Sequence, residues 1–135
     1  LKKKNDLKNS LKNQILKNKK NLKKLEKLIH PLVRKEMKKF YFLNQNKKKL
    51  FYEIPLLIES KLMRYFDVII FIKSKKKLRL RRFKANGGDI KLFNLLNGKQ
   101  FSDQIKAKFS DHTVVNEKNL NILKKKLSGI ISKYV

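Results

Sequence analysis

Apolar residues in the first third of the chain recur at the spacing of amphipathic helices. Six of them lie three, four or seven positions apart and so form one helical stripe, while Lys and Asn fill the other face; these six are Leu7, Leu11, Ile15, Leu22, Leu25 and Ile29. The residue before a proline avoids the α region, whereas proline itself suits a first helical turn. The His30–Pro31 pair therefore predicts a break and a second helix that begins at Pro31 and ends at the polar run 44–49.

The middle of the chain contains short apolar runs that are typical of strands. Leu50–Pro55 predicts a buried strand that stops at the proline, and a short helix is expected at about Glu59–Arg64. The clearest strand is Val68–Ile72, because all five residues are β-branched or aromatic. A strand that is apolar on both faces is typical of the middle of a parallel sheet.

Capping residues divide the remainder of the chain into short helices. Ser74 is expected to cap a helix that runs to about Ala85, where Gly87–Gly88 supplies the positive φ that ends it. Asp89 is expected to cap the next helix, which ends at Gly98.

The last third of the chain continues the same alternation. Ser102 begins a further helix, residues 113–115 form a short strand, and an amphipathic helix runs from Leu120 to Tyr134. Strands separated by helices predict an α/β fold with right-handed crossovers.

Composition limits the class of protein. The 135 residues carry a net charge of +27, yet 41% of them are hydrophobic, which is enough for a compact domain and excludes a disordered basic tail. The longest apolar run, Val68–Ile72, is far short of the roughly 20 residues that span a bilayer, and the first residues contain no apolar signal core. We expect a soluble, cytoplasmic protein without a membrane partner.

The positive charge is weak evidence for nucleic-acid binding. Lys contributes 32 of the 37 basic residues, and abundant Lys, Asn, Ile and Phe together indicate A/T-rich codons that raise Lys on every exposed face. The absence of Cys excludes disulfides and thiolate metal sites, and His30 and His112 have no neighbouring carboxylate cluster. No metal site is predicted from these residues.

Several stretches, taken in order, resemble the dephospho-CoA kinase family. Residues 25–37 (LEKLIHPLVRKEM) are similar to its Leu-x-His-Pro-Leu-Val segment, and residues 52–62 (YEIPLLIESKL) to its Val-Pro-Leu-Leu-Phe-Glu loop. The residues that match the family's lid arginine, its Gln and Lys, its Ala-Asp pair and its Asn turn are Arg82, Gln100, Lys106, Asp111 and Asn116. Each piece alone is weak, but their shared order from about Leu22 onward makes the resemblance specific.

The resemblance implies a fold and a reaction. The fold would be a P-loop kinase-like three-layer sandwich with a parallel sheet, incomplete in this chain, plus helical substrate-binding and lid segments. Residues 1–49 would belong to the region that binds the CoA substrate, and residues 50–135 to the carboxy-terminal part of the kinase core, with the lid at about 84–110. The enzyme would use ATP and Mg²⁺ to phosphorylate the ribose 3′-hydroxyl of dephospho-CoA, the last step of coenzyme A biosynthesis, and would be a monomer when complete.

The resemblance also implies roles for individual residues, each with a plain structural alternative. Arg82 would stabilise the transferring phosphate, or would simply belong to an exposed basic face. His30 would contact the substrate, or would serve a helix junction. The wall of the substrate site would include Pro55, Leu56, Leu57 and Glu59; alternatively the leucines are core and Glu59 favours a helix start. Gln100, Lys106 and Asn116 would bind the nucleotide, and Asn116 alternatively forms an ordinary turn.

The chain departs from the family pattern in informative places. It contains no G-x-x-x-x-G-K-S/T phosphate-binding loop and only four Gly. The family's second arginine near Asn86 is absent, with Lys84 as a partial substitute, and Ser110 stands where Ala is usual. Together with a first residue that is not Met, these departures predict an amino-terminally truncated segment. On its own this segment is expected to be inactive and loosely packed, because its strands would flank a missing one.

A small basic RNA-binding or ribosome-associated protein is the alternative class. Phe40, Tyr41, Phe51 and Tyr52 lie beside Lys runs, as base-stacking side chains do. An RNA surface requires these aromatics to be exposed, whereas their alternation is typical of a core, and no RNP, KH or zinc-knuckle motif occurs. We therefore favour the kinase and expect no specific nucleic-acid partner.

Overall fold

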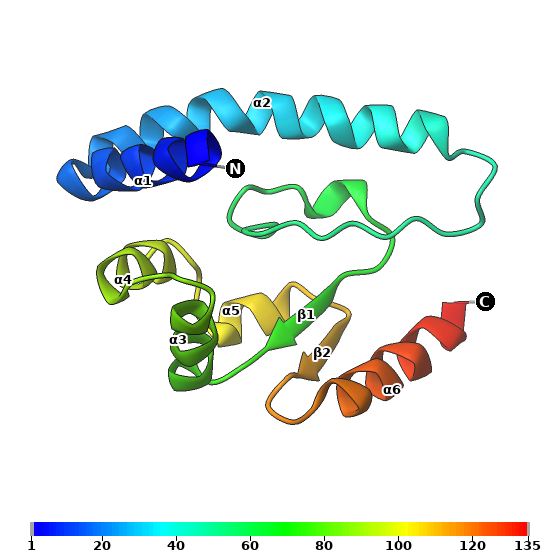
Figure 1. Cartoon of the computed structure of the whole chain (residues 1–135). Helices are drawn as coiled ribbons and strands as arrows, with labels where there is room; N and C mark the ends of the chain where they lie inside the picture. Colours follow the sequence, from blue (N-terminus) through cyan, green and yellow to red (C-terminus); the bar gives the residue numbers. More distant parts are fainter. Residues whose placement is uncertain (1, 135) are drawn as a thin grey trace. The chain divides into compact units, whose positions relative to one another are not determined.

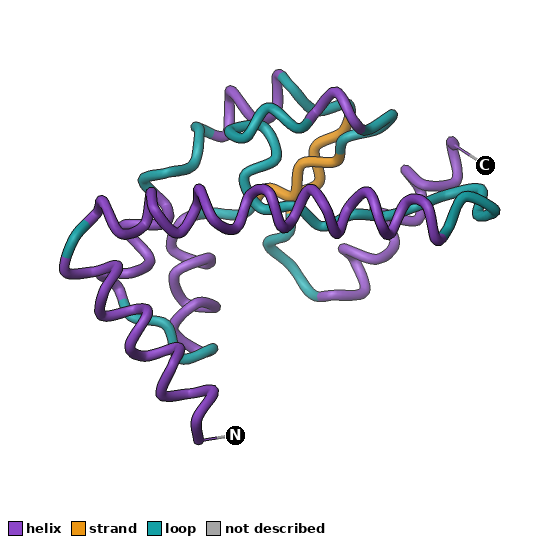
Figure 2. The backbone as a smooth tube through the Cα atoms, turned by 90° about the horizontal axis from the view of Figure 1, so that it is seen from above, coloured by secondary structure: helices purple, strands orange, loops and turns teal. Residues whose placement is uncertain are grey.

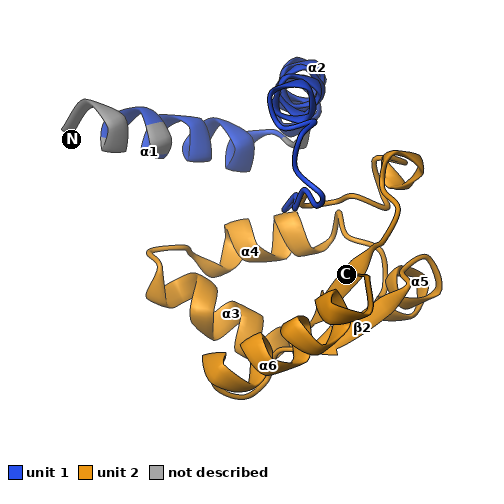
Figure 3. Ribbon diagram, turned by 90° about the vertical axis from the view of Figure 1, so that its right-hand side faces the viewer, with its two compact units in different colours: residues 1–53 blue, residues 54–135 orange. Residues whose placement is uncertain are grey.

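A computed structural model describes residues 2–134, apart from the side chains of residues 2–5, 8 and 19. The chain forms two compact units, residues 1–53 and 54–135 (Figure 3). In chain order the elements are α1 (Lys2–Lys17), α2 (Lys19–Leu43), η1 (Met63–Tyr65), β1 (Ile70–Lys73), α3 (Lys76–Ala85), α4 (Ile90–Asn97), α5 (Asp103–Lys108), β2 (His112–Val115), α6 (Leu120–Ile131) and η2 (Ser132–Tyr134) (Figure 1). The predicted α/β class is confirmed.

The first unit is a helical pair that breaks at Asn18. The Asn18 side chain accepts a hydrogen bond from the Lys20 backbone N–H at 2.9 Å and so caps α2. Ile15 and Leu22, on either side of the break, are buried as α1 folds back onto α2. The apolar stripe is therefore divided between two helices, α1 and α2, which pack against each other.

The predicted break at Pro31 is wrong, because α2 continues through this proline. A proline inside a helix removes one backbone N–H and leaves the carbonyl four residues earlier without its helical donor. That carbonyl belongs to Lys27, which is exposed, so water can replace the lost donor. The local preference of His30–Pro31 is outweighed by the helix on both sides.

Two predicted elements after α2 are also wrong. Residues 50–54 run without strand pairing, and the expected helix at 59–64 is a tight turn followed by η1. A strand is held by hydrogen bonds to a neighbouring strand, and no other described residue pairs with 50–54. Apolar composition alone does not supply that partner.

The second unit contains a parallel pair of strands. β1 pairs with β2 in a register that joins Ile70 to His112 and Lys73 to Val115, and Figure 2 shows the two strands side by side. Val114 is only 2% exposed, while α5 contacts β1 and α6 contacts β2. The predicted strands at 68–72 and 113–115 and their parallel direction are confirmed, with β1 shifted toward Lys73.

The caps of the later helices are mostly as predicted. The Asp89 carboxylate accepts from the Leu92 N–H at 2.8 Å, the Ser102 hydroxyl accepts from Ile105 at 3.3 Å, and Gly87 has a φ of +79°. The predicted cap at Ser74 is wrong, since α3 starts after Lys75 and the buried Ser74 hydroxyl has no hydrogen-bond partner among the described residues. Strand β1 extends to Lys73 and leaves Ser74 too early for the cap position.

Aromatic residues that were expected in the core are exposed. Phe40, Tyr41 and Phe51 expose 43%, 55% and 64% of their surface. Phe40 does meet the Tyr52 ring edge-on, at 5.2 Å between centroids. The first unit is small, so it has too little apolar surface to cover every side of the 25-residue helix α2.

None of the helices described in the structure combines the length and apolarity that crossing a membrane requires.

Candidate functional site

The carboxyl ends of β1 and β2 meet at one edge of the sheet, where open α/β proteins bind ligands. A pocket of about 320 Å³ lies beside this edge. Its walls come from the end of β1, α3, the end of α4 and the start of α5: Lys73, Lys76, Arg79, Asn97, Gln100, Phe101, Ser102, Asp103 and Gln104. Three cations face a single carboxylate there, so the pocket suits an anionic group.

Arg82 ties helix α3 to the turn that follows β2. Its guanidinium donates to the backbone oxygen of Asn116 at 3.1 Å and to the Asn116 side-chain oxygen at 3.4 Å. The Asn116 N–H donates in turn to the Lys73 carbonyl at 2.8 Å. Arg82 is half-buried, whereas Arg81 beside it is exposed. The guanidinium is thus fixed at the strand ends and is no member of a freely solvated basic face.

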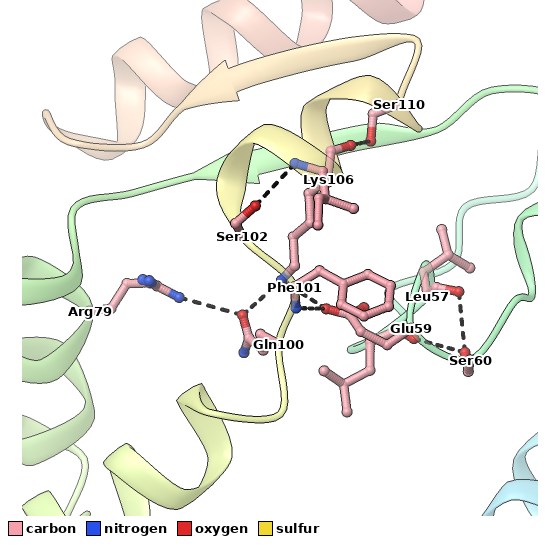
Figure 4. Close-up of polar contacts among 11 residues, drawn as sticks. Leu57, Glu59, Ser60, Arg79, Gln100, Phe101, Ser102, Lys106 and Ser110 are labelled. Atoms are coloured by element: carbon pink, nitrogen blue, oxygen red, sulfur yellow. Dashed lines mark hydrogen bonds and ion pairs between the residues drawn. The ribbon is translucent and has the colours of Figure 1, made fainter.

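A second group of contacts joins residues from three segments. We call Glu59, Arg79, Gln100, Phe101 and Lys106 the Glu59 cluster (Figure 4). The Glu59 carboxylate accepts from the Phe101 N–H at 2.7 Å and lies 3.4 Å from the Lys106 ammonium. The Gln100 side-chain oxygen accepts from Lys106 at 2.7 Å and from Arg79 at 3.4 Å. Residues expected at the substrate and at the nucleotide therefore contact each other.

The turn that carries Glu59 has a strained backbone. Leu56 and Lys61 have φ angles of 59° and 57°, in the left-handed region that non-glycine residues rarely occupy. The Ser60 hydroxyl donates to the Leu56 carbonyl at 2.8 Å, and buried Ile58 and Leu62 anchor the turn. Non-glycine residues persist in this conformation only where their surroundings hold them, and such sites are often functional.

Strain at Lys61 predicts an unusual effect of glycine. Lys61→Gly is expected to raise the free energy of unfolding by about 0.5–1 kcal/mol, because glycine adopts a positive φ without penalty. Chemical denaturation of the complete gene product measures this change. As a control, Lys77→Gly in the exposed part of α3 should lower the same quantity by about 1 kcal/mol. Equal destabilisation by both variants would contradict the strain.

The other predicted substrate residues have different surroundings. Leu56 and Leu57 are half-buried in the turn, and Pro55 is exposed at its start. His30 lies exposed inside the continuous helix α2, in the first unit, so it does not occupy a helix junction.

Arg79 is a candidate that sequence reasoning missed. It lines the pocket, contacts Gln100, and has a buried Nε without a hydrogen-bond partner among the described residues. Its position three residues before Arg82 puts both on one side of a helix, which was the signal available in the sequence. Lys73 and Lys76 were missed as well, because nothing distinguishes them from the many other lysines until the pocket is known.

The described residues offer no ready-made cage of protein ligands for Mg²⁺. No group of three His, Asp or Glu side chains that would hold a metal occurs in the described part of the chain. The pocket's carboxylate, Asp103, faces the Lys73 ammonium at 3.9 Å. Hard cations such as Mg²⁺ prefer carboxylate and phosphate oxygens, and this pocket offers mainly cations.

The fold and the site together define an α/β protein with a basic pocket at the carboxyl ends of parallel strands, as in proteins that bind phosphate-bearing ligands. A family model described as dephospho-CoA kinase matches residues 2–121, and the chain belongs to this family. The match extends the resemblance, which the motifs carried from about Leu22, toward the amino terminus.

Curated relatives agree with the family match. The chain is similar to a dephospho-CoA kinase of Rickettsia bellii, with 28% identity over 110 residues that cover 81% of this chain and 58% of the relative. For that of Rickettsia conorii the identity is 30%, with 80% and 57% covered, and for that of Protochlamydia amoebophila it is 34%, with 76% and 53% covered. The chain thus spans little more than half the length of the curated relatives it matches.

Proposed function

We propose that this chain forms the carboxy-terminal, lid-bearing part of an ATP-dependent dephospho-CoA kinase that phosphorylates the ribose 3′-hydroxyl in the last step of coenzyme A biosynthesis. The observation that carries this proposal is the Arg82–Asn116 contact at the ends of two parallel strands, beside a basic pocket. Family membership supports it. Residues 1–49 are proposed to serve the CoA substrate, and residues 50–135 the kinase core, with the lid at about 84–110.

The proposed reaction is a transfer of the γ-phosphoryl group. The substrate 3′-oxygen forms a bond to the γ-phosphorus of ATP, the bond from that phosphorus to the bridging oxygen breaks, and ADP leaves with the electron pair. The hydroxyl proton passes to a base that is not assigned among these residues. Arg82 would stabilise the negative charge on the transferring group, since positioning and charge neutralisation dominate this chemistry.

The remaining roles follow from the same proposal. Pocket cations such as Lys76 and Arg79 would contact nucleotide phosphates, and Asn116 would help to hold the nucleotide. Mg²⁺, which the resemblance implies, is assigned no protein ligand and no step here. We propose a monomeric enzyme that works in the cytoplasm on two soluble substrates. The 135 residues include no phosphate-binding loop, so they are not expected to transfer phosphate by themselves.

The test is a product assay with the complete gene product, dephospho-CoA, ATP and Mg²⁺. Chromatography with mass detection should show CoA and ADP in equal amounts. An analogue of dephospho-CoA without the 3′-hydroxyl should give no phosphorylated product, because the accepting oxygen is missing. A folded protein that forms no CoA, or that phosphorylates the analogue equally well, would contradict the proposal.

RNA binding is a second candidate because the aromatic residues of α2 and the following loop are exposed. Phe40, Tyr41 and Phe51 lie beside Lys runs, as stacking platforms do. Binding to random RNA that is weak and falls steeply with salt would identify a non-specific Lys surface. Tight binding to one RNA at physiological salt would favour this candidate over the kinase.

A further inference from the structure

The Glu59 cluster contains two residues that do not reach the pocket and three that line it. Arg79, Gln100 and Phe101 are pocket residues, whereas Glu59 and Lys106 are not among the lining side chains. We propose that the Glu59–Lys106 ion pair is a latch that fixes the Gln100 amide, so that its NH₂ group offers hydrogen bonds to a phosphate in the pocket. Glu59 and Lys106 are then positioning residues. This inference rests on the proposed function.

The latch begins at the strained turn. Positive φ angles at Leu56 and Lys61 hold the turn in one conformation, together with the Ser60 hydroxyl, which shares its one proton between the Leu56 and Leu57 carbonyls. Buried Ile58 and Leu62, on either side of Glu59, anchor it. A turn fixed in this way presents the Glu59 carboxylate at a defined position.

From there the carboxylate holds the segment before α5. One oxygen of Glu59 accepts from the Phe101 N–H at 2.7 Å, a contact between residues 42 positions apart in the sequence. The same oxygen lies 3.4 Å from the Lys106 ammonium. The side chains of Lys106 and Glu59 are only 13% and 11% exposed, so water screens their attraction weakly. Loss of either partner would leave the other charge buried without its counter-ion.

The third step is the orientation of the Gln100 amide. Its oxygen faces two cations, the Lys106 ammonium at 2.7 Å and the Arg79 guanidinium at 3.4 Å (Figure 4). Both cations are donors only, so the amide oxygen must point toward them and the NH₂ group away. An amide NH₂ held beside Arg79 is a suitable donor for phosphate oxygens. The sequence assigned Lys106 and Glu59 to ligands, and this geometry gives them an indirect role.

Substitution of Gln100 tests the ligand side. Gln100→Glu keeps an oxygen for Lys106 and Arg79 but replaces the NH₂ group by a second negative oxygen, which repels phosphate. Calorimetry with ADP and the complete gene product should show a Kd about tenfold higher. Asn94→Asp, which adds the same charge at an exposed position of α4 that does not line the pocket, should change the Kd much less. Equal effects of the two variants would overturn the role of the amide.

A double-mutant cycle tests the latch. Glu59→Gln keeps an acceptor for the Phe101 N–H but loses the charge, and Lys106→Met loses the cation. Each should raise the ADP Kd about fivefold, and the double variant about fivefold as well, because one linked unit is broken only once. Lys108→Met, on the exposed part of α5, is the matched control and should leave the Kd unchanged.

The outcomes separate the latch from the other possibilities. A Kd raised by Lys106→Met but not by Glu59→Gln would overturn the latch and make Lys106 a direct ligand contact. If Glu59→Gln, Lys106→Met and the double variant all lower the melting temperature but leave the ADP Kd unchanged, the Glu59–Lys106 ion pair stabilises the fold and has no role in binding. If the wild-type protein does not bind ADP, the proposed function fails. Hydrogen exchange of the Phe101 amide, expected to accelerate in Glu59→Ala but not in Glu59→Gln, then still tests the turn's hold on this segment.

Discussion

Arg82→Ala in the complete gene product is expected to lower kcat for phosphoryl transfer about 10²-fold and to change the nucleotide Kd much less. In the proposed role, the Arg82 guanidinium would act chiefly on charge that develops in the transition state. The same side chain holds the Asn116 turn with two hydrogen bonds, so the truncation also releases the end of β2 from α3. Steady-state kinetics together with nucleotide calorimetry separates the two parameters.

Variants of the same helix isolate the contribution of Arg82. Arg81→Ala removes an equal charge from the neighbouring exposed position and should leave kcat within about twofold. Arg82→Lys keeps the charge but loses the forked pair of bonds to Asn116, so it should recover only part of the activity. Full activity in Arg82→Ala would make Arg82 a structural tie and nothing more.

Phe93→Ala is expected to cost about 3–5 kcal/mol, the largest loss of stability foreseen for a single substitution in this chain. Phe93 is the buried residue of α4, 7% exposed, and its ring lies 5.7 Å from that of Phe83 on α3. The Phe83 ring lies so close over Gly88 that a Cβ at this position would clash with it. These three residues lie where α3 contacts α4, so loss of the Phe93 ring leaves a cavity between the two helices.

Hydrogen exchange measures where this loss occurs. The amides of α3 and α4 should lose protection in Phe93→Ala, while those of β2 should change less. Ile90→Ala is the control on the same helix, since Ile90 is 47% exposed and should cost about 1 kcal/mol or less. Similar losses in both variants would show that the contact between the two rings contributes little.

Local signals in the sequence predicted the strands and most helix ends of the second unit, although the helix at 59–64 and the cap at Ser74 were wrong. Asp89 and Ser102 cap helices where their side chains can reach a backbone N–H, and Gly87 supplies a positive φ where α3 ends. The strands at 68–72 and 113–115 were predicted from their apolar residues, and their parallel direction from the helices that separate strands along the chain, whereas their pairing came from the structure. In each case the deciding interaction lies within a few residues or within the apolar pattern itself.

Predictions that depended on distant partners were less successful. Residues 50–54 have the composition of a strand but no strand beside them among the described residues, and Pro31 lies inside a helix whose two flanks outweigh one missing hydrogen bond. The aromatic residues of α2 look like core in the sequence, but their own unit does not cover them. Pairing and burial require a second surface, and one segment's residues do not specify it.

The candidate site shows the same division. By itself the sequence determined the family and the candidates Arg82, Gln100, Lys106 and Asn116, because these residues follow one another in the order of the family's motifs. Only the tertiary structure decided which of them touch. It joined Arg82 to Asn116, brought Glu59 from a distant turn to Lys106, and revealed Arg79 and two lysines around one pocket. The order of motifs along the chain is enough to recognise the family. Contacts between residues 34 or 42 positions apart, however, exist only when strands and helices bring those residues together.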